Sequence, residues 1–449
     1  MNYTEFKESV MAAARAEGLE DYELYYMETE TVSAEVLHHE LNTFSSSSQA
    51  GACFRCVADG RMGYAATELF TEEEASRVVE AAMKNASSIE NTETAQIHAS
   101  GDTYEKVTPV RTAEPSAARL IDLALNIQEQ AYREDSRIAD GTQSFASFQR
   151  TTCSLCNSRG LDLSDTSDYC AAGCIAVAAD GEERFDGFEM KAAGFDDLSP
   201  KKLAARAAEE ATAGIGAETV NTGSYSVVFS GRMTAALLST FFSVFSAESA
   251  QRGLSLLAGR EGETIAAPLV TITDDPFRED SLIRIPFDGE GVATRRKCVV
   301  ENGRLCTLLH NLATAGKAGA ASTGNGQRIS YASAVTVRPF SFFLNPGGAG
   351  AKEDLFAAMQ NGIYVTELNG LHAGANPATG DFSLSAAGFL IENGEKTRPV
   401  KNFTVSGNFY DLLKNIALVG DDLDFQTPRG YSCFGGPSIL VKDMAVAGK

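Results

Sequence analysis

Residues 361–396, NGIYVTELNGLHAGANPATGDFSLSAAGFLIENGEK, specify the local structure on which our interpretation of the fold rests. The first run is rich in β-formers and ends at Asn369-Gly370, a favoured tight-turn pair. A second run begins at Gly380-Asp381, and its alternation of apolar residues shifts by one position at Gly388, where we expect a β-bulge. Asn393-Gly394 then turns the chain back into a weakly alternating run. The stretch therefore predicts a curved antiparallel sheet.

Helical spacing follows this sheet. In residues 409–418, FYDLLKNIAL, apolar side chains recur at helical intervals, so we expect a helix that closes the sheet. Another helix is expected over 352–361. The preceding glycine-rich segment, 346–352, lacks the spacing of a phosphate-binding loop, because Glu353 replaces the hydroxyl residue required after the lysine.

The N-terminal half alternates between helical and strand patterns. We expect serines 45–48 to form a connection after two strands, and Asp59-Gly60 to form a hairpin turn. The helices are expected at about 6–14, 71–85, 115–131 and 200–213, and the strands at 21–29, 31–44, 51–60, 61–66, 143–155, 167–179 and 182–192.

The segment 214–224, GIGAETVNTGS, is the best candidate for a linker. The sequence therefore predicts an α+β protein of two domains, residues 1–220 and 221–449. We expect curved, mainly antiparallel sheets flanked by helices, with a β-rich C-terminal domain. No solenoid repeat or low-complexity tract is present.

Composition favours a cytoplasmic protein. The N-terminus lacks an apolar signal region, and the longest apolar run is too short to span a bilayer. Nine cysteines, an odd number, indicate reduced thiols rather than a disulfide framework. The net charge of -22 disfavours a nucleic-acid surface, which requires clustered Lys and Arg. We therefore expect neither nucleic acid nor membrane as a partner.

Several ordered motifs resemble the TldD/PmbA family. They run through nearly the whole chain. Each motif alone is a weak turn signature, and the resemblance rests on their shared order along the sequence. They are DGRMGY (59–64), NSRG (157–160), DGEG (288–291), VENGRL (300–305), STGNG (322–326), GIYVTEL (362–368), TGDFS (379–383), IENGE (391–395) and PV (399–400).

This resemblance implies a cytoplasmic metalloprotease system in which one member carries H-E-x-x-x-H on a helix and a related member lacks it. The corresponding helix here should be 231–253, after the strand 225–230. Zinc chemistry needs imidazole ligands and a carboxylate that activates water. Residues 233–247 contain no His, Asp, Glu or Cys, and Glu248 has no histidine at ligand spacing. We therefore expect no metal and no cofactor in this chain.

A cysteine near the C-terminus completes the site of the catalytic type, as the resemblance implies. The corresponding stretch, 420–430, has no cysteine, and Cys433 lies beyond it. Two other cysteine pairs, 53/56 and 153/156, have the look of a four-thiolate zinc site. Because they fall in strand patterns, where positions i and i+3 point to opposite faces, we interpret them as buried residues. Cys170 and Cys174 share a face and read as core.

The five histidines form no motif. His38 and His39 are expected as neighbours on a strand, His98 lies in a polar loop and His310 ends a strand-like run. His372 with Cys433 would make a thiol–imidazole pair if the fold brought them together. No G-x-S-x-G elbow is present.

The resemblance implies a metal-free, substrate-guiding subunit of a TldD/PmbA-type protease that handles short unfolded peptides. Its expected partner is an H-E-x-x-x-H-bearing, TldD-type homologue that holds the zinc, in a homo- or hetero-oligomer. A sheet edge can hold an extended peptide by main-chain pairing. Because the zinc is expected in the partner, we expect no catalytic residues in this chain. The candidate residues for binding a peptide along a sheet edge are Gly362, Tyr364, Val365, Gly380, Asp381 and Phe382.

Two alternatives to this interpretation stay open. In the first, the chain is a stand-alone peptide-binding protein without a protease partner. In the second, it is a hydrolase that uses a thiol or metal site not visible in the sequence.

Overall fold

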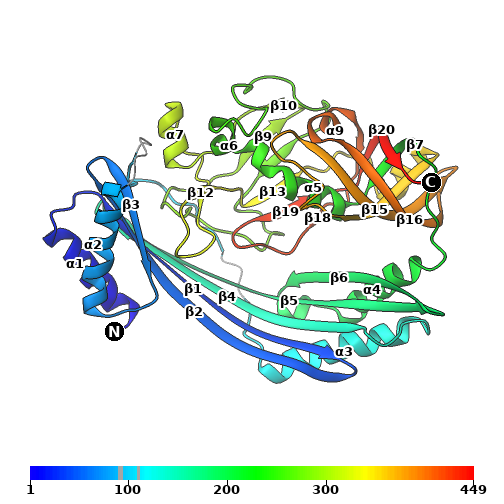
Figure 1. The fold of residues 1–449 in the computed structure, drawn as a ribbon, viewed down its shortest axis with the longest axis horizontal. Coiled ribbons are helices and arrows are strands. Elements are labelled where there is room, and N and C mark those ends of the chain that lie inside the picture. The colour runs from blue at the N-terminus through cyan, green and yellow to red at the C-terminus, as the bar shows by residue number, and fades with distance from the viewer. Residues whose placement is uncertain (89–94, 109–111) are drawn as a thin grey trace.

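The computed structural model describes residues 1–88, 95–108 and 112–449. Its N-terminal part is built on one long, curved antiparallel sheet with the strand order β3-β2-β1-β4-β5-β6 (Figure 1). These strands are β1 (Tyr22–Leu37), β2 (Glu40–Ala58), β3 (Arg61–Thr67), β4 (Gln143–Asn157), β5 (Asp162–Asp180) and β6 (Glu183–Ala193).

Helices cover one face of this sheet. They are α1 (Tyr3–Ala16), α2 (Glu72–Ser88), α3 (Ala117–Glu134) and α4 (Pro200–Ala213), with a short 3₁₀ turn η1 (Phe195–Asp197). In α1, Phe6, Val10 and Ala14 are buried one turn apart, and Asn2 with Glu5 caps the first turn reciprocally. The α1–α2 pair packs on one end of the sheet, and α3 with α4 packs on the other.

One sequence prediction in this sheet is wrong. Residues 21–29 and 31–44 are not two strands, and serines 45–48 are not a connection, because β1 and β2 are continuous and pair directly. The turn between them is His38-His39, whose φ angles are 54° and 63°. Both positive φ values give a primed hairpin turn, for which the sequence carries none of the usual Asn or Gly signals. These histidines therefore lie in a turn rather than on a strand.

The C-terminal part contains two six-stranded sheets and a two-stranded ribbon. The first has the order β16-β15-β14-β7-β20-β17, and a further β16–β20 pairing curls it toward closure. The second has the order β10-β9-β8-β13-β19-β18. Buried side chains of α5 (Gly231–Phe241) join the large core shared by these sheets.

The remaining strands are β7 (Gly223–Phe229), β8 (Ile272–Asp274), β9 (Lys297–Glu301), β10 (Arg304–Leu305), β11 (Gly326–Gln327), β12 (Thr336–Val337), β13 (Ser341–Leu344), β14 (Gly362–Asn369), β15 (Asp381–Glu392), β16 (Glu395–Asn408), β17 (Ile416–Val419), β18 (Asp424–Phe425), β19 (Cys433–Gly436) and β20 (Ile439–Ala447). The other helices are η2 (Phe242–Phe245), α6 (Ala247–Gln251), α7 (Leu312–Ala318), α8 (Lys352–Met359) and α9 (Phe409–Asn415).

The predicted helix 231–253 is shorter than expected. It ends at Phe241, continues as a 3₁₀ turn, and restarts as α6 after Ser246. Ser246 is extended and forms a parallel bridge with Leu309, whose amide donates to the carbonyl of Phe245. This tertiary pairing interrupts the helix. Similarly, the helix expected over 409–418 ends at Asn415, because Ile416 begins a strand that pairs with β20.

The predicted α+β class with curved, mainly antiparallel sheets is confirmed. Asn393-Gly394 forms the expected turn, with φ angles of 55° and 79°. The pairing register shifts around residues 386–388, as expected for a bulge near Gly388. In the part of the chain that the structure describes, no helix is both long and apolar enough to cross a membrane.

Candidate functional site

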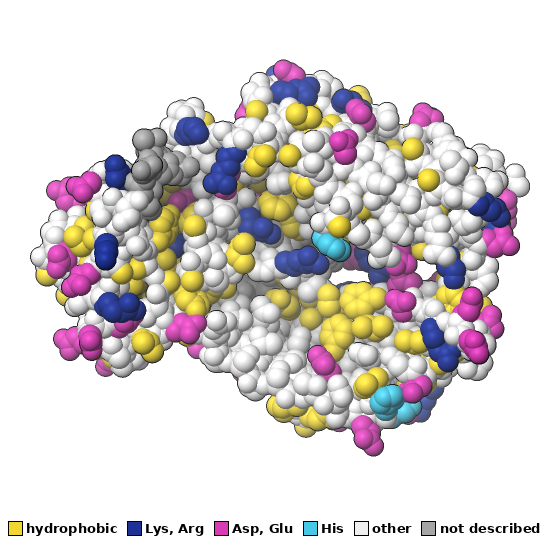
Figure 2. All heavy atoms as spheres, in the orientation of Figure 1, with side chains coloured by type: hydrophobic (Ala, Val, Ile, Leu, Met, Phe, Trp, Pro, Cys, Tyr) yellow, Lys and Arg dark blue, Asp and Glu magenta, His cyan; other side chains and the backbone are white. Residues whose placement is uncertain are grey.

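The molecule is hollowed between the N-terminal sheet and the C-terminal part (Figure 2). The sheet face opposite the helices borders this hollow. At one end of that face, Tyr25 and Cys153 pack with Phe340 of the C-terminal part. At the other end, Arg232 of α5 donates to the carbonyl of Phe188 in β6, with an Nη1–O distance of 2.9 Å. The two parts thus meet at both ends of the sheet, with the hollow between them.

A buried ionic cluster joins the two parts at the Tyr25 end. Arg55 on β2 donates twice to Glu23 on β1, at 2.7 Å and 3.1 Å, and once to Glu290 at 3.2 Å. Arg328 donates to Glu23 at 3.0 Å. The side chains of Glu23, Arg55 and Arg328 are at most 1% exposed. Such pairs are favourable only when every charge keeps its partner, so this cluster fixes the position of one part against the other.

Asp288 extends the cluster. Its carboxylate accepts the amides of Glu290, Val292 and Gly326 at 2.8–3.0 Å. Burial, followed by the charge of Glu290, raises the pKa of Asp288 to about 8. A small cavity beside it is lined by Tyr431, Tyr25 and Arg328 among others. Its volume of about 10 Å³ is the size needed for a single water molecule.

The floor of the hollow is apolar near β6. Phe145 in β4, Ile175 in β5, and Phe188 and Met190 in β6 share the hollow-facing side, because opposite residues in paired strands point to one face. Gly173 lets the Phe145 ring lie flat over the sheet, since a Cβ there would stand 2.6 Å from that ring. Phe188 is 41% exposed. Hydrophobic side chains gather on the sheet side of the hollow in Figure 2.

Between the apolar region and the ionic cluster, the same face is polar. Five of its half-buried side chains carry hydroxyls or amides: Thr29, Thr31, Ser33, Ser147 and Gln149. The charged Asp165 lies farther along this face, opposite Cys153. Uncharged donors and acceptors beside an apolar region suit an extended peptide, whose backbone needs hydrogen bonds and whose side chains include apolar ones.

Arg232 anchors the far end of the hollow. Besides Phe188, it contacts Glu210 of α4 at 2.5 Å and the carbonyl of Thr366 at 3.2 Å. Burial raises the pKa of Glu210, against the opposing effect of Arg232. Thr366 lies in the middle of β14, so Arg232 connects this strand to the N-terminal sheet.

The helix that we expect to correspond to the zinc-motif helix, α5, is apolar. In α5, nearly all side chains from Met233 to Phe241 are buried in the core. The first carboxylate after it, Glu248, already accepts the amide of Val337 at 3.2 Å and pairs with Arg252 at 3.0 Å. Within residues 1–88, 95–108 and 112–449, no group of three or more His, Cys, Asp or Glu side chains is arranged to hold a metal.

The predicted peptide-binding residues on β14 lie inside a sheet. Gly362, Tyr364 and Val365 are buried, and β14 pairs with β15 on one side and with β7 over 363–365 on the other. Their main-chain N–H and C=O groups are therefore already hydrogen-bonded to β15 and β7. An extended ligand could pair with β14 only beyond the end of β7, along 366–369.

The other predicted binding residues begin β15. Gly380, with φ 84°, packs against the Tyr410 ring, and the Phe382 ring lies tilted against Phe241 in the core, with ring centroids 6.1 Å apart. Asp381 is exposed and accepts from Asn408 at 2.9 Å. The structure thus does not gather the six predicted residues into one cavity. Their role in binding stays a prediction.

The cysteine pairs divide between the two faces of the N-terminal sheet, as predicted. Cys56 and Cys156 pack beneath α1 and α2, whereas Cys153 packs toward the C-terminal part. All four are buried, Cys53 included.

Cys433 is also buried, and its thiol donates to the carbonyl of Gln426 at 3.0 Å. Burial raises the pKa of Cys433 to about 12, so the reactive thiolate is scarce at neutral pH. His372 lies in an exposed turn after β14. His310 is buried, which lowers its pKa.

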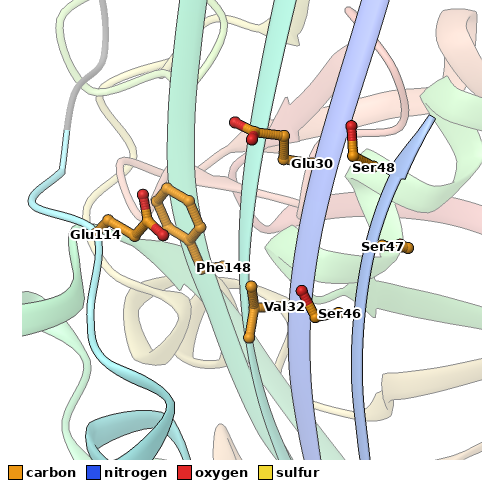
Figure 3. Close-up of a pocket in the computed structure, with 7 residues that line it drawn as sticks. All are labelled: Glu30, Val32, Ser46, Ser47, Ser48, Glu114 and Phe148. Carbon is orange, nitrogen blue, oxygen red and sulfur yellow. The ribbon is translucent and has the colours of Figure 1, made fainter. Parts of the chain in front are cut away.

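A second pocket of about 160 Å³ lies on β1, β2 and β4, near the segment that leads into α3 (Figure 3). Glu30 and Glu114 line it with Phe148 and three serines. Both carboxylates already pair with Arg150, at 3.3 Å and 3.0 Å. A single guanidinium thus serves both carboxylates, so the two glutamates and Arg150 together carry a net negative charge.

The sequence analysis missed the ionic cluster. Glu23 and Arg55 alternate with apolar residues on β1 and β2, which is the pattern of solvent-facing positions on half-buried strands. Only the contact with Glu290 and Arg328, more than 200 positions away, shows that this face is covered.

Comparison with known proteins decides the family. The model described as the PmbA/TldA metallopeptidase C-terminal domain matches residues 222–448, half of the chain. The models of the central domain and of domain 1 match residues 111–215 and 22–86. The chain belongs to the PmbA/TldD metallopeptidase family.

Its relatives include Metalloprotease PmbA of Escherichia coli O157:H7, 28% identical over 75% of this chain and 71% of that protein. A metalloprotease of Methanothermobacter thermautotrophicus is 29% identical over 91% of each chain. A crystal structure from Thermotoga maritima, named as a candidate modulator of a DNA gyrase, superposes with TM-score 0.90, 32% identity and coverage of 99% and 100%. TldE from Thermococcus kodakarensis shares the fold, with TM-score 0.88, 24% identity and coverage of 98% and 99%.

Proposed function

We propose that this chain is the metal-free, substrate-guiding subunit of a cytoplasmic TldD/PmbA-type metalloprotease complex that acts on short unfolded peptides. The chain supplies the hollow and the peptide-binding surface. An H-E-x-x-x-H-bearing homologue supplies the zinc and the activated water.

The observation that carries this proposal is the chemistry of α5. Water activation needs a Lewis acid and a general base in fixed geometry. The segment 233–247 contains no metal ligand, and its side chains are mostly committed to the core. The family is named for metallopeptidases, and TldD-type relatives occur beside PmbA-type ones: the Metalloprotease TldD homolog of Haemophilus influenzae is 31% identical over 42% of this chain.

The hollow supports the peptide part of the proposal. Its floor joins an apolar region to a region whose side chains are mostly hydroxyls and amides, and a narrow space between two parts admits an extended chain more readily than a folded domain. This placement differs from the predicted lining of β14 and β15, whose main-chain groups are largely paired.

The experiment compares the purified chain alone, a TldD-type homologue alone and the two mixed. We expect the chain alone to leave an unfolded peptide intact and to contain no stoichiometric zinc by elemental analysis. The mixture should cleave the peptide faster than the homologue alone, while a folded domain stays intact in every sample. Hydrolysis by this chain alone would contradict the proposal.

A matched pair of variants separates the thiol alternative. Cys433→Ser removes the buried thiol, and Cys306→Ser removes an exposed one as the control. We expect both to leave the activity of the mixture unchanged. Loss of activity in Cys433→Ser alone, with an unchanged melting temperature, would favour a thiol hydrolase.

A further inference from the structure

Two cysteines of this chain are open to reagents in solution. Cys306 is exposed and Cys298 is half-buried, whereas the other seven cysteines are buried. A buried thiol in apolar surroundings is inert, because it neither meets a reagent nor ionises readily. Thiol chemistry on the folded protein is therefore confined to Cys298 and Cys306.

A tight hairpin brings these two cysteines together. β9 and β10 are joined by Asn302-Gly303, whose φ angles of 49° and 80° make a two-residue primed turn. The amide of Cys306 donates to the carbonyl of Val299 at 2.9 Å. Cys306 therefore lies opposite Val299 and diagonally across the hairpin from Cys298.

A β-bulge brings the two side chains to one another. A regular ladder would direct Cys298 and Cys306 to opposite faces of the hairpin, because Cys298 is one residue out of step with the Val299–Cys306 pair. On its other side, β9 pairs with β8 through Cys298 and Val300 but skips Val299. Such an extra residue re-aims the neighbouring side chains. The thiols of Cys298 and Cys306 accordingly form a hydrogen bond with each other.

We propose that Cys298 and Cys306 form a reversible thiol–disulfide site, which a small-molecule disulfide oxidises. The Cys306 thiolate attacks one sulfur of the reagent, whose S–S bond breaks and releases one thiolate. The Cys298 thiolate then attacks the Cys306 sulfur of this mixed disulfide and releases the second thiolate. The two protein thiols thus give up two electrons and two protons, and the reagent becomes two thiols.

Exposure and charge set the order of the two attacks. Cys306 meets the reagent first because it is exposed. Burial, followed by the charge of Cys306, raises the pKa of Cys298 to about 11. In the mixed disulfide Cys306 no longer carries a charge, so its contribution to that rise disappears and Cys298 ionises more readily. Cys306 is thus the attacking thiol and Cys298 the resolving one.

The test incubates the purified, folded full chain with glutathione disulfide and follows its mass by intact mass spectrometry. We expect a loss of about 2 Da, the mass of two hydrogens, which dithiothreitol reverses. Arg304 lies between the two cysteines, so trypsin under non-reducing conditions should release peptides 298–304 and 305–317 as one linked species. This inference does not rest on the proposed function, because it needs neither substrate nor catalytic partner.

Two variants check the order of attack. Cys298→Ser lacks the resolving thiol and should stop as a glutathione adduct on Cys306. Cys306→Ser lacks the attacking thiol and should keep its mass. Wild-type chain alkylated at Cys306 should also keep its mass, which repeats the test without a substitution.

Three results would overturn the proposal. The first is a stable glutathione adduct on the wild-type chain without the linked peptides. The second is a Cys298–Cys306 disulfide that forms only after unfolding in urea. The third is oxidation of Cys306→Ser at the rate of the wild-type chain.

Discussion

At the scale of single residues, the ionic cluster has the largest expected effect on stability. Arg55 is buried between two carboxylates, so Arg55→Met leaves Glu23 and Glu290 with fewer cationic partners in a buried site. Removing one member of a buried pair typically costs about 3–5 kcal/mol. Urea unfolding should show that the free energy of unfolding of Arg55→Met falls by about this amount.

The matched control is Arg133→Met. Arg133 pairs with Glu129, and their side chains are 64% and 56% exposed; such exposed pairs contribute less than about 1 kcal/mol. Equal losses for the two variants would show that the cluster at the hollow does not hold the two parts together.

Buried thiols predict alkaline instability. Burial raises the pKa of Cys170 and of Cys174 from 9.0 to about 12. Between these values the unfolded state binds fewer protons than the folded state, so stability is full below pH 9 and falls as pH rises toward 12. Between pH 9 and 10 the free energy of unfolding should fall by roughly 1 kcal/mol for each such thiol.

Urea midpoints measured across this pH interval test the effect. The double variant Cys170→Ala, Cys174→Ala should show a shallower decline, whereas Cys306→Ala, at an exposed position, should keep the wild-type slope. A slope that is the same in all three proteins would assign the alkaline loss to other groups.

At the scale of secondary structure elements, Gly388 carries the curvature of β15. A Cβ at this position would stand 1.9 Å from the carbonyl oxygen of Tyr364 on β14. Gly388→Ala must therefore push two paired strands apart and should cost about 1–3 kcal/mol. Gly223→Ala is the control, since its nearest new contact is 3.5 Å away; calorimetric melting should separate the two.

Turn chemistry explains which elements could be predicted. Asp59-Gly60 and Asn393-Gly394 carry residues that accept positive φ, and both turns were predicted correctly. His38-His39 adopts the same conformation without such residues, so the long β1–β2 hairpin was missed. The break after Phe241 was also missed, because it follows from pairing with Leu309, which no local pattern encodes.

At the scale of the whole molecule, the hollow should bind peptides through its apolar floor. Phe188→Asp places a charge there and should weaken binding of an unfolded, apolar-rich peptide at least severalfold, as measured by fluorescence anisotropy. Leu69→Asp changes an exposed leucine after β3 and should leave the affinity unchanged. If both variants bind like the wild type, the peptide lies elsewhere.

The sequence predicted the fold class, but it did not indicate the hollow in which we propose that a peptide lies. The β14 and β15 motifs suggested a binding edge, yet β7 and β16 occupy those edges. The hollow is formed by residues such as Phe145 and Arg232, which come from separate parts of the chain. Such a surface depends on how the parts dock, and strand periodicity alone does not determine that.

The ionic cluster also constrains the order of events during protein synthesis. Glu23 accepts from Arg328, which is 305 positions later in the chain. At about 5–20 residues per second, a ribosome needs roughly 15–60 s to make the intervening segment. During that interval the nascent N-terminal sheet exposes Tyr25 and the Glu23–Arg55 pair without their C-terminal cover. The newborn chain therefore passes through a long-lived, half-covered state, which is the stage at which a chaperone would have the most surface to protect.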